Sequence, residues 1–208
     1  MNELKFTGER FVPGCGDEQL AAEHLQRYLA AAELADNKCV LDAACGEGYG
    51  SRILASRARR VLGIDKDRAS IDHACEKYSG EKISFRCMDI CSMEALNDNS
   101  FDLVVSYETV EHLEAEQQAL FLSEISRVLK PDGCLIMSTP NREIYEKHRE
   151  KSNEFHRHEL SAEEFEEYLK QVFPHVKLYG QSFRAAGLLT EADTTSDTMK
   201  AISNISGF

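Results

Sequence analysis

The chain has 208 residues and a formal net charge of −12, and this length suits one domain with a substantial core. The negative charge disfavours a large nucleic-acid footprint, because phosphate contacts supply most of that affinity and need clustered Lys and Arg. No apolar run approaches the ~20 residues of a membrane span, and the N-terminal MNELKFTGERF has no signal-peptide core, which predicts a cytoplasmic protein.

Apolar runs alternate with helical patterns along the chain, which is typical of a parallel, doubly wound sheet. Strands are predicted near residues 39–44, 60–65, 83–88, 101–107, 133–139 and 175–182. Helices are predicted near residues 17–35, 49–58, 67–78, 114–129 and 161–171. The last helix opens with Ser161 and Glu164, the signature of a capping box.

The most informative stretch is VLDAACGEGYG, residues 40–50, where an apolar strand passes through an acid into three alternating glycines. Gly46, Gly48 and Gly50 allow a sharp turn and a close approach to a ligand. The alternative is a turn that only joins a strand to a helix. Asp65, at the end of the next apolar run, favours a ligand, because a carboxylate there binds ribose hydroxyls in doubly wound sheets.

Two classes of nucleoside cofactor use this layout. The dinucleotide fingerprint needs G-x-G-x-x-G to hold a pyrophosphate, but the third residue after Gly48 is Ser51. Asp42, inside the strand end, would repel a pyrophosphate and suits a cationic amine and sulfonium instead. The sequence therefore indicates S-adenosylmethionine.

Four further blocks follow in order: GIDKD, FRCMDI, FDLVVSYETVEHL and KPDGCLIMSTPN. With them, residues 38–141 resemble class I S-adenosylmethionine-dependent methyltransferases. The resemblance implies an α/β, Rossmann-like doubly wound, mostly parallel sheet of six to seven strands with helices on both faces. Family members usually close the sheet with an antiparallel strand, for which MKAISNI at residues 199–205 is a weak candidate.

The same resemblance assigns contacts to the cofactor. It implies that Asp42 and the glycine turn face the methionine portion and that Asp65 binds the ribose. Asp89 would accept a hydrogen bond from the adenine amino group. The alternative for these acids is a turn or a helix cap. The expected cofactor-binding residues are Arg10, Asp42, Ala44, Gly46, Gly48, Gly50, Asp65, Lys66, Met88, Asp89, Ile90 and Tyr107.

The N-terminal TGERFVPG resembles the leader of a bacterial methyltransferase subgroup associated with surface-sugar pathways. Such leaders tend to fold over the cofactor, where the forked donors of Arg10 would suit its carboxylate. The alternative is that Phe11 only pins the tail.

The block ETVEH follows the fourth strand, at the edge where a methyl acceptor must enter. In a helical turn, Glu108 would share a face with Glu111 and His112. His156 and His158 follow the fifth strand on the same rim. A set of two glutamates and two histidines suits Mg²⁺, Mn²⁺ or Zn²⁺, with histidine favouring the latter two.

Two groups of enzymes resemble this arrangement. Small-RNA 3′-terminal 2′-O-methyltransferases of the HEN type carry E-x-x-E-H, TPN and a later histidine, and bind a metal that grips ribose hydroxyls. Aligning TPNRE puts His156, rather than His158, on their last ligand. Ubiquinone-pathway O-methyltransferases also carry E-x-x-E-H followed by STPNR. The resemblance implies the metal ligands Glu108, Glu111, His112 and His156, with His112, His156 and Glu108 as the catalytic candidates.

We expect a methyltransferase that acts on a hydroxyl of a small molecule, sugar or glycan, with or without a metal, for which a histidine would serve as the base. In the alternative, ETVEH only caps a helix and lines the cofactor pocket. The competing functions are RNA 3′-terminal 2′-O-methylation, which the acidic composition and the absence of Trp disfavour, and cofactor binding without catalysis.

The expected organisation is one domain over residues 1–208. It comprises an N-terminal lid and helix (1–36), a cofactor-binding core (37–141), a substrate-side insertion (142–160), and a C-terminal helix with the sheet closure (161–208).

Overall fold

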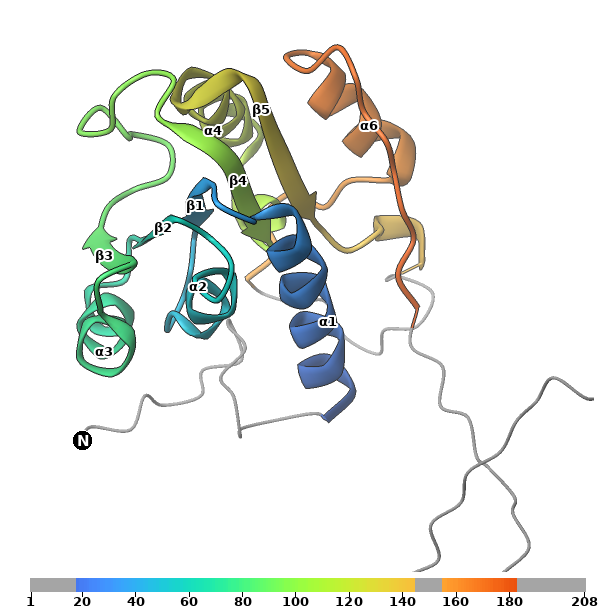
Figure 1. Ribbon diagram of the computed structural model, residues 1–208. Coiled ribbons are helices and arrows are strands. Elements are labelled where there is room, and N and C mark those ends of the chain that lie inside the picture. The colour runs from blue at the N-terminus through green and yellow to red at the C-terminus, as the bar shows by residue number, and fades with distance from the viewer. Residues whose placement is uncertain (1–17, 145–154, 183–208) are drawn as a thin grey trace, which may run out of the picture.

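The computed structural model describes residues 18–144 and 155–182. Within them, five parallel strands form one sheet in the order β3-β2-β1-β4-β5 (Figure 1). The strands are β1 (Cys39–Ala43), β2 (Arg60–Asp65), β3 (Ile83–Cys87), β4 (Phe101–Tyr107) and β5 (Leu129–Ser138). The helices are α1 (Glu18–Leu34), α2 (Tyr49–Leu54), α3 (Arg68–Tyr78), the 3-10 helix η1 (Val110–His112), α4 (Ala115–Val128) and α6 (Ala162–Lys170). The predicted doubly wound fold is confirmed.

Helices cover both faces of the sheet because its central strands are apolar on both sides. All five residues of β1 are buried. Val40 packs into the core beneath α1, α2 and α3, whereas its neighbour Leu41 packs into the core beneath α4. Figure 1 shows α1, α2 and α3 on one side of the sheet and α4 on the other. Adjacent side chains of a strand point to opposite faces, so a continuous apolar run is what such a strand requires.

The strand order reverses direction beside β1. The chain runs outward from β1 through β2 to β3, and then crosses to β4 and β5 on the other side of β1. Ligands of doubly wound sheets bind at such a switch point, outside the carboxyl ends of the strands. The glycine turn after β1 and the ETVEH block after β4 both lie there.

Two parts of the sheet differ from the sequence-based prediction. The fifth strand begins at Leu129 rather than at residue 133, because residues 130–133 bulge out between the pairs Phe101–Leu129 and Leu103–Cys134.

The strand predicted at residues 175–182 does not form. Tyr179 there is 80% exposed, and the Gln181 side chain donates to the carbonyl of Glu23 in α1 at 3.1 Å. A strand needs a pairing partner, and the candidate at residues 199–205 lies outside the described residues. That closure of the sheet therefore stays a prediction.

The helix starts agree more closely with the sequence. Ser161 and Glu164 form the predicted capping box of α6, in which each side chain bonds the other residue's backbone N–H. Among residues 18–144 and 155–182, no helix combines the length and apolar character that a bilayer crossing requires.

Candidate functional site

The carboxyl ends of the strands open into a wide cavity of about 2400 Å³. Its wall includes the ends of β1, β2, β4 and β5, the segment after β3 and one face of α1. Of the expected cofactor contacts, Ala44, Gly46, Asp65, Lys66, Asp89, Ile90 and Tyr107 line it. Asp42, Gly48, Gly50 and Met88 are not part of this wall, and Arg10 lies outside the described residues.

Only the first of the three glycines in the turn borders the cavity. Gly46 has a φ of 54°, and a Cβ built on it would meet no heavy atom within 4 Å. A Cβ on Gly48 would lie 2.9 Å from the Phe85 ring, and one on Gly50 would lie 2.0 Å from the Tyr28 ring. The second and third glycines therefore make room for packing beneath the turn, and the first leaves space for a ligand.

Asp42 lies beneath the turn as a buried carboxyl group. Its side chain accepts hydrogen bonds from the Ser51 hydroxyl at 2.6 Å and from the Tyr28 hydroxyl at 3.1 Å. Burial raises the pKa of Asp42 to about 7, the two hydrogen bonds oppose this rise, and the charge of Asp65 adds to it. Through these two hydrogen bonds Asp42 ties the end of β1 to α1 and α2, the helices on either side of the turn.

Asp65 and Asp89 end two neighbouring strand regions on the cavity wall. Asp65 accepts from the backbone N–H of Gly46 at 2.9 Å and of Asp67 at 2.8 Å, and Asp89 accepts from that of Cys91 at 2.8 Å. Both acids therefore shape turns, as the alternative interpretation expects. Because each carboxylate oxygen has two lone pairs, both can also accept from a ligand in the cavity.

Arg27 of α1 is a cavity residue that the sequence analysis missed. Its Nη1 donates to Glu108 at 3.2 Å, and its guanidinium lies over the Tyr107 ring, 5.9 Å from the centroid. Its Nε and Nη2 are buried without a hydrogen-bond partner in the described part of the chain. These two atoms form one edge of the guanidinium, with parallel N–H bonds that match a carboxylate. The sequence signal that could have identified Arg27 is its position as a charged residue on the buried side of the predicted first helix.

The block after β4 contains strained and buried acids. Glu108 has a φ of 50°, an unusual conformation for a residue other than glycine, and it accepts from the Ser138 hydroxyl at 2.6 Å. Glu111 is 1% exposed and accepts from the Thr139 hydroxyl at 3.1 Å. Burial, followed by the charge of Glu108, raises the pKa of Glu111 to about 8.

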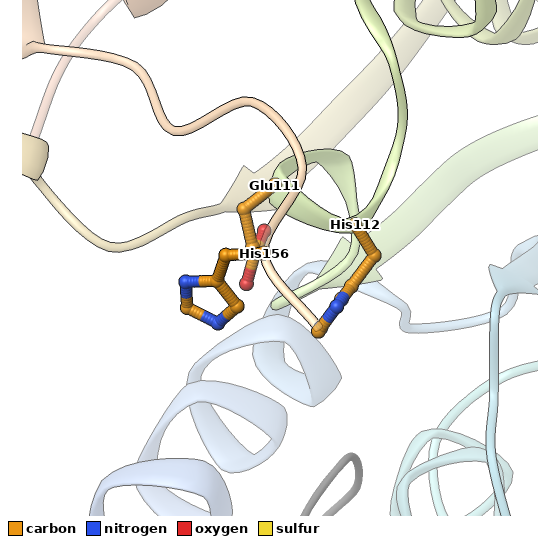
Figure 2. A group of neighbouring side chains, drawn as sticks. All are labelled: Glu111, His112 and His156. Atoms are coloured by element: carbon orange, nitrogen blue, oxygen red, sulfur yellow. The ribbon is translucent and has the colours of Figure 1, made fainter. Parts of the chain in front are cut away.

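Glu111, His112 and His156 lie together, as Figure 2 shows. Each offers one ligand atom, and these atoms lie within 4.8 Å of one another. The two imidazole rings are 5.1 Å apart and nearly perpendicular. The sequence placed Glu108 in this set, but the helical turn begins only at Val110, and Glu108 bonds Arg27 and Ser138 instead.

The third histidine lies apart from the cluster. His158 contacts the side chain of Gln118 in α4 through its Nδ1, at 3.1 Å. One carboxylate and two imidazoles form a donor set that suits Mn²⁺, Zn²⁺ or Fe²⁺ better than Mg²⁺, which prefers oxygen ligands.

Two comparisons with known proteins both identify a methyltransferase. A family model described as a methyltransferase domain matches residues 41–137. The chain is 38% identical over 187 residues to a Mycolicibacterium smegmatis protein named probable S-adenosylmethionine-dependent methyltransferase. The aligned region covers 89% of this chain and 71% of that protein.

Two more distant similarities cover smaller parts. The chain is 34% identical over 111 residues to the ubiquinone biosynthesis O-methyltransferase of Idiomarina loihiensis, spanning 51% of this chain and 44% of that enzyme. Among solved structures, it is similar to a chain of the complex between the Haloferax volcanii Trm112 methyltransferase activator and a methyltransferase. The TM-score is 0.59 at 23% identity, over 72% of this chain and 66% of that one, and this likeness concerns the fold alone.

Proposed function

Since the chain belongs to the S-adenosylmethionine-dependent methyltransferases, we propose that it methylates a hydroxyl group of a small molecule, sugar or glycan. The observation that carries this proposal is the cluster of Glu111, His112 and His156, whose residues line the same cavity. The half-length similarity to a ubiquinone-pathway O-methyltransferase supports oxygen as the accepting atom.

The cofactor would lie across the strand ends. Asp65 would accept from its ribose hydroxyls, and Asp89 with Ile90 would border its adenine. The methionine portion would then reach Gly46, the glycine that leaves room for a ligand. The paired Nε and Nη2 donors of Arg27 suit the cofactor carboxylate, so Arg27 is a second candidate for the role expected of Arg10.

The reaction is an in-line displacement at the methyl carbon. The acceptor oxygen forms a bond to that carbon while the carbon–sulfur bond breaks and leaves its electron pair on sulfur. A hydroxyl group is a poor nucleophile until its proton leaves, so the site must supply a base. His112 or His156 would take this proton, and the fixed cofactor would set the line of attack.

A divalent metal would fit the same cluster. Glu111, His112 and His156 would hold it, since their donor atoms lie close together and their chemistry suits a nitrogen-preferring cation. A metal bound by two neighbouring hydroxyls of the acceptor would lower their pKa and fix their orientation. The buried Glu111 carboxyl, whose pKa lies well above its ordinary value, would gain a positive charge beside it.

A titration of Mn²⁺ into metal-stripped protein saturated with S-adenosylhomocysteine tests this proposal. Calorimetry should show one site, and a Glu111→Ala/His112→Ala variant should lose it. The enzyme should then consume S-adenosylmethionine when it is given members of a panel of hydroxyl acceptors. Vicinal diols should react faster than the same compounds already methylated at one oxygen.

Absence of Mn²⁺ binding would exclude the metal and leave a metal-free enzyme with a histidine base. Two other outcomes would count against the proposed reaction itself. Transfer to RNA 3′ ends but not to sugars or small diols would favour the RNA alternative, and S-adenosylhomocysteine binding without transfer to any acceptor would favour a non-catalytic protein.

A further inference from the structure

The two histidines of the cluster are held by one short segment of chain, residues 155–159. The backbone carbonyl of Phe155 lies 2.9 Å from Nδ1 of His112. The carboxylate of Glu159 contacts Nδ1 of His156. The segment is attached to η1, because the carbonyl of Glu111 accepts from the backbone N–H groups of Arg157 at 2.8 Å and His158 at 3.2 Å.

Both contacts fix the same tautomer. A carbonyl and a carboxylate can only accept, so the Nδ1 atom that each contacts carries the proton. A neutral imidazole with a proton on Nδ1 has its lone pair on Nε2, and that lone pair is what binds a metal or accepts a proton. The contact that favours this tautomer of His112 is with a backbone carbonyl, whereas that of His156 is with the side chain of Glu159.

Glu159 is well placed to control the ring of His156. The Glu159 side chain is 11% exposed and that of His156 is 8% exposed, so solvent competes little for the contact. The Glu159 backbone carbonyl also accepts from Arg142 at 3.0 Å, which holds the residue in place from the other side. Carboxylates that bond the second nitrogen of a metal-binding histidine orient the ring and raise its basicity.

We propose that Glu159 is a positioning residue that holds His156 with its proton on Nδ1 and its lone pair on Nε2 for the site formed with Glu111 and His112. The effect of Glu159 on metal binding rests on the proposed function, whereas its effect on the tautomer of His156 does not. The sequence offered no sign of this role, because glutamates are frequent just before a helix.

The first test is nuclear magnetic resonance of the ring nitrogens in metal-free protein, in mildly alkaline buffer. Wild type should show His156 and His112 with the proton on Nδ1. Glu159→Ala should move the His156 population towards a proton on Nε2 and leave His112 unchanged, because the Phe155 carbonyl remains. Glu163→Ala, which removes an exposed glutamate from the first turn of α6, should change neither ring.

The second test measures Mn²⁺ affinity in the presence of S-adenosylhomocysteine. Glu159→Ala should weaken binding by roughly 10- to 100-fold, the usual effect of losing such a carboxylate. Glu159→Gln keeps the shape and removes the charge, so it should fall between wild type and Glu159→Ala. Glu163→Ala should bind as wild type does.

Three results separate the possibilities. An unchanged His156 tautomer in Glu159→Ala would overturn the proposal, as would a change in both histidines, which would mean that Glu159 holds the segment rather than the ring. Lack of Mn²⁺ binding by wild type would count against the metal-assisted function alone. A His156 tautomer that responds to Glu159→Ala would then still establish its positioning role.

Discussion

Asp42 is a carboxyl group at the centre of the sheet with only 1% of its surface exposed. Burial removes this carboxyl group from water, which disfavours its charged form. Two hydroxyl groups that donate hydrogen bonds compensate only in part, so the pKa of Asp42 rises to about 7. A protein that needed only stability would place an apolar residue here. The carboxyl group therefore has an energetic cost, which is consistent with a role for Asp42 beneath the glycine turn in the proposed cofactor site.

The first prediction concerns stability against pH. The unfolded chain loses the Asp42 proton near pH 4, whereas the folded protein keeps it up to about pH 7, so this group lowers the free energy of unfolding as pH rises through that window. Asp42→Asn cannot ionise and should lack this decline. One pKa unit corresponds to roughly 1.4 kcal/mol, so the variant should gain on the order of a few kcal/mol relative to wild type by pH 8.

Denaturant unfolding of both proteins at a series of pH values measures this difference. A gap between wild type and Asp42→Asn that stays constant from pH 4 to pH 8 would contradict a raised pKa.

The second prediction concerns Asp65. Asp65→Ala should weaken S-adenosylhomocysteine binding by at least about tenfold, because hydrogen bonds to a charged group contribute roughly 1.5–3 kcal/mol each. Calorimetry measures the affinity, and a melting curve checks that loss of the Gly46 contact has not unfolded the turn. Asp72→Ala removes an equal charge from an exposed pair on α3 and should bind normally. Wild-type affinity in Asp65→Ala would refute the assigned ribose site.

At the scale of elements, one aromatic ring of α1, that of Tyr28, contacts both the sheet and α2. The Tyr28 hydroxyl donates to Asp42 of β1, and its ring packs edge-on against Tyr49 and Tyr107 at 5.3 Å and 4.9 Å. Gly50 of α2 lies directly against the same ring. Arg27 reaches the cavity because its neighbour Tyr28 is fixed in this way, so the packing of α1 and the composition of the site are coupled.

The third prediction separates the glycines of the turn. Gly46→Ala places a methyl group in open cavity at a positive φ, so it should cost about 1–2 kcal/mol of stability and abolish S-adenosylhomocysteine binding. Gly50→Ala drives a methyl group into the Tyr28 ring and should cost about 1–3 kcal/mol through overpacking.

Thermal melting and calorimetry of the two variants provide the comparison. In a Tyr28→Ala background, Gly50→Ala should lose most of its cost, since the clash is removed. An equal cost of Gly50→Ala in both backgrounds would show that the ring is not the cause.

The elements that could be predicted are those with a strong local signal. β1 is apolar at nearly every position because helices cover both of its faces, and α6 carries its own capping residues. The cluster of Glu111, His112 and His156 was also within reach, because each follows a strand whose carboxyl end defines the rim of a parallel sheet.

What the sequence could not supply depends on contacts between distant residues. Arg27 and Glu108 are 81 positions apart, and nothing in the local sequence around either residue predicts that they form an ion pair. The positive φ that removes Glu108 from the helical turn leaves no pattern in the residue types. The contact of Glu159 with His156 requires the path of a loop, and the strand predicted at residues 175–182 required a pairing partner that local propensity cannot provide.

At the scale of the whole molecule, every described strand is parallel, so all five carboxyl ends lie on one rim. The proposed cofactor position follows β3, β2 and β1, and the proposed acceptor position follows β4 and β5. The reversal of strand order beside β1 places these two positions next to each other. Tyr107, an expected cofactor contact at the end of β4, would bring the second half of the sheet into the cofactor site.

The fourth prediction follows from this arrangement. S-adenosylhomocysteine at about 100 times its dissociation constant should stabilise the folded protein by roughly 2.7 kcal/mol. Because its site includes residues from both halves of the sheet, the whole cooperative transition should move. Differential scanning calorimetry measures this shift. NAD at the same concentration should leave the transition unchanged, and an equal shift with NAD would contradict the choice of cofactor.

The proton on Asp42 also bears on product inhibition. S-adenosylmethionine carries a sulfonium charge that its product lacks. In the proposed cofactor position this charge would lie over the turn above Asp42, and a positive charge nearby favours the ionised form of a carboxyl group. Binding of the charged cofactor should therefore release a proton from Asp42 near neutral pH. As the medium becomes more alkaline, the fixed charge on Asp42 increasingly favours the charged cofactor over the neutral thioether. The enzyme should thus be least inhibited by its own spent cofactor on the alkaline side of neutrality.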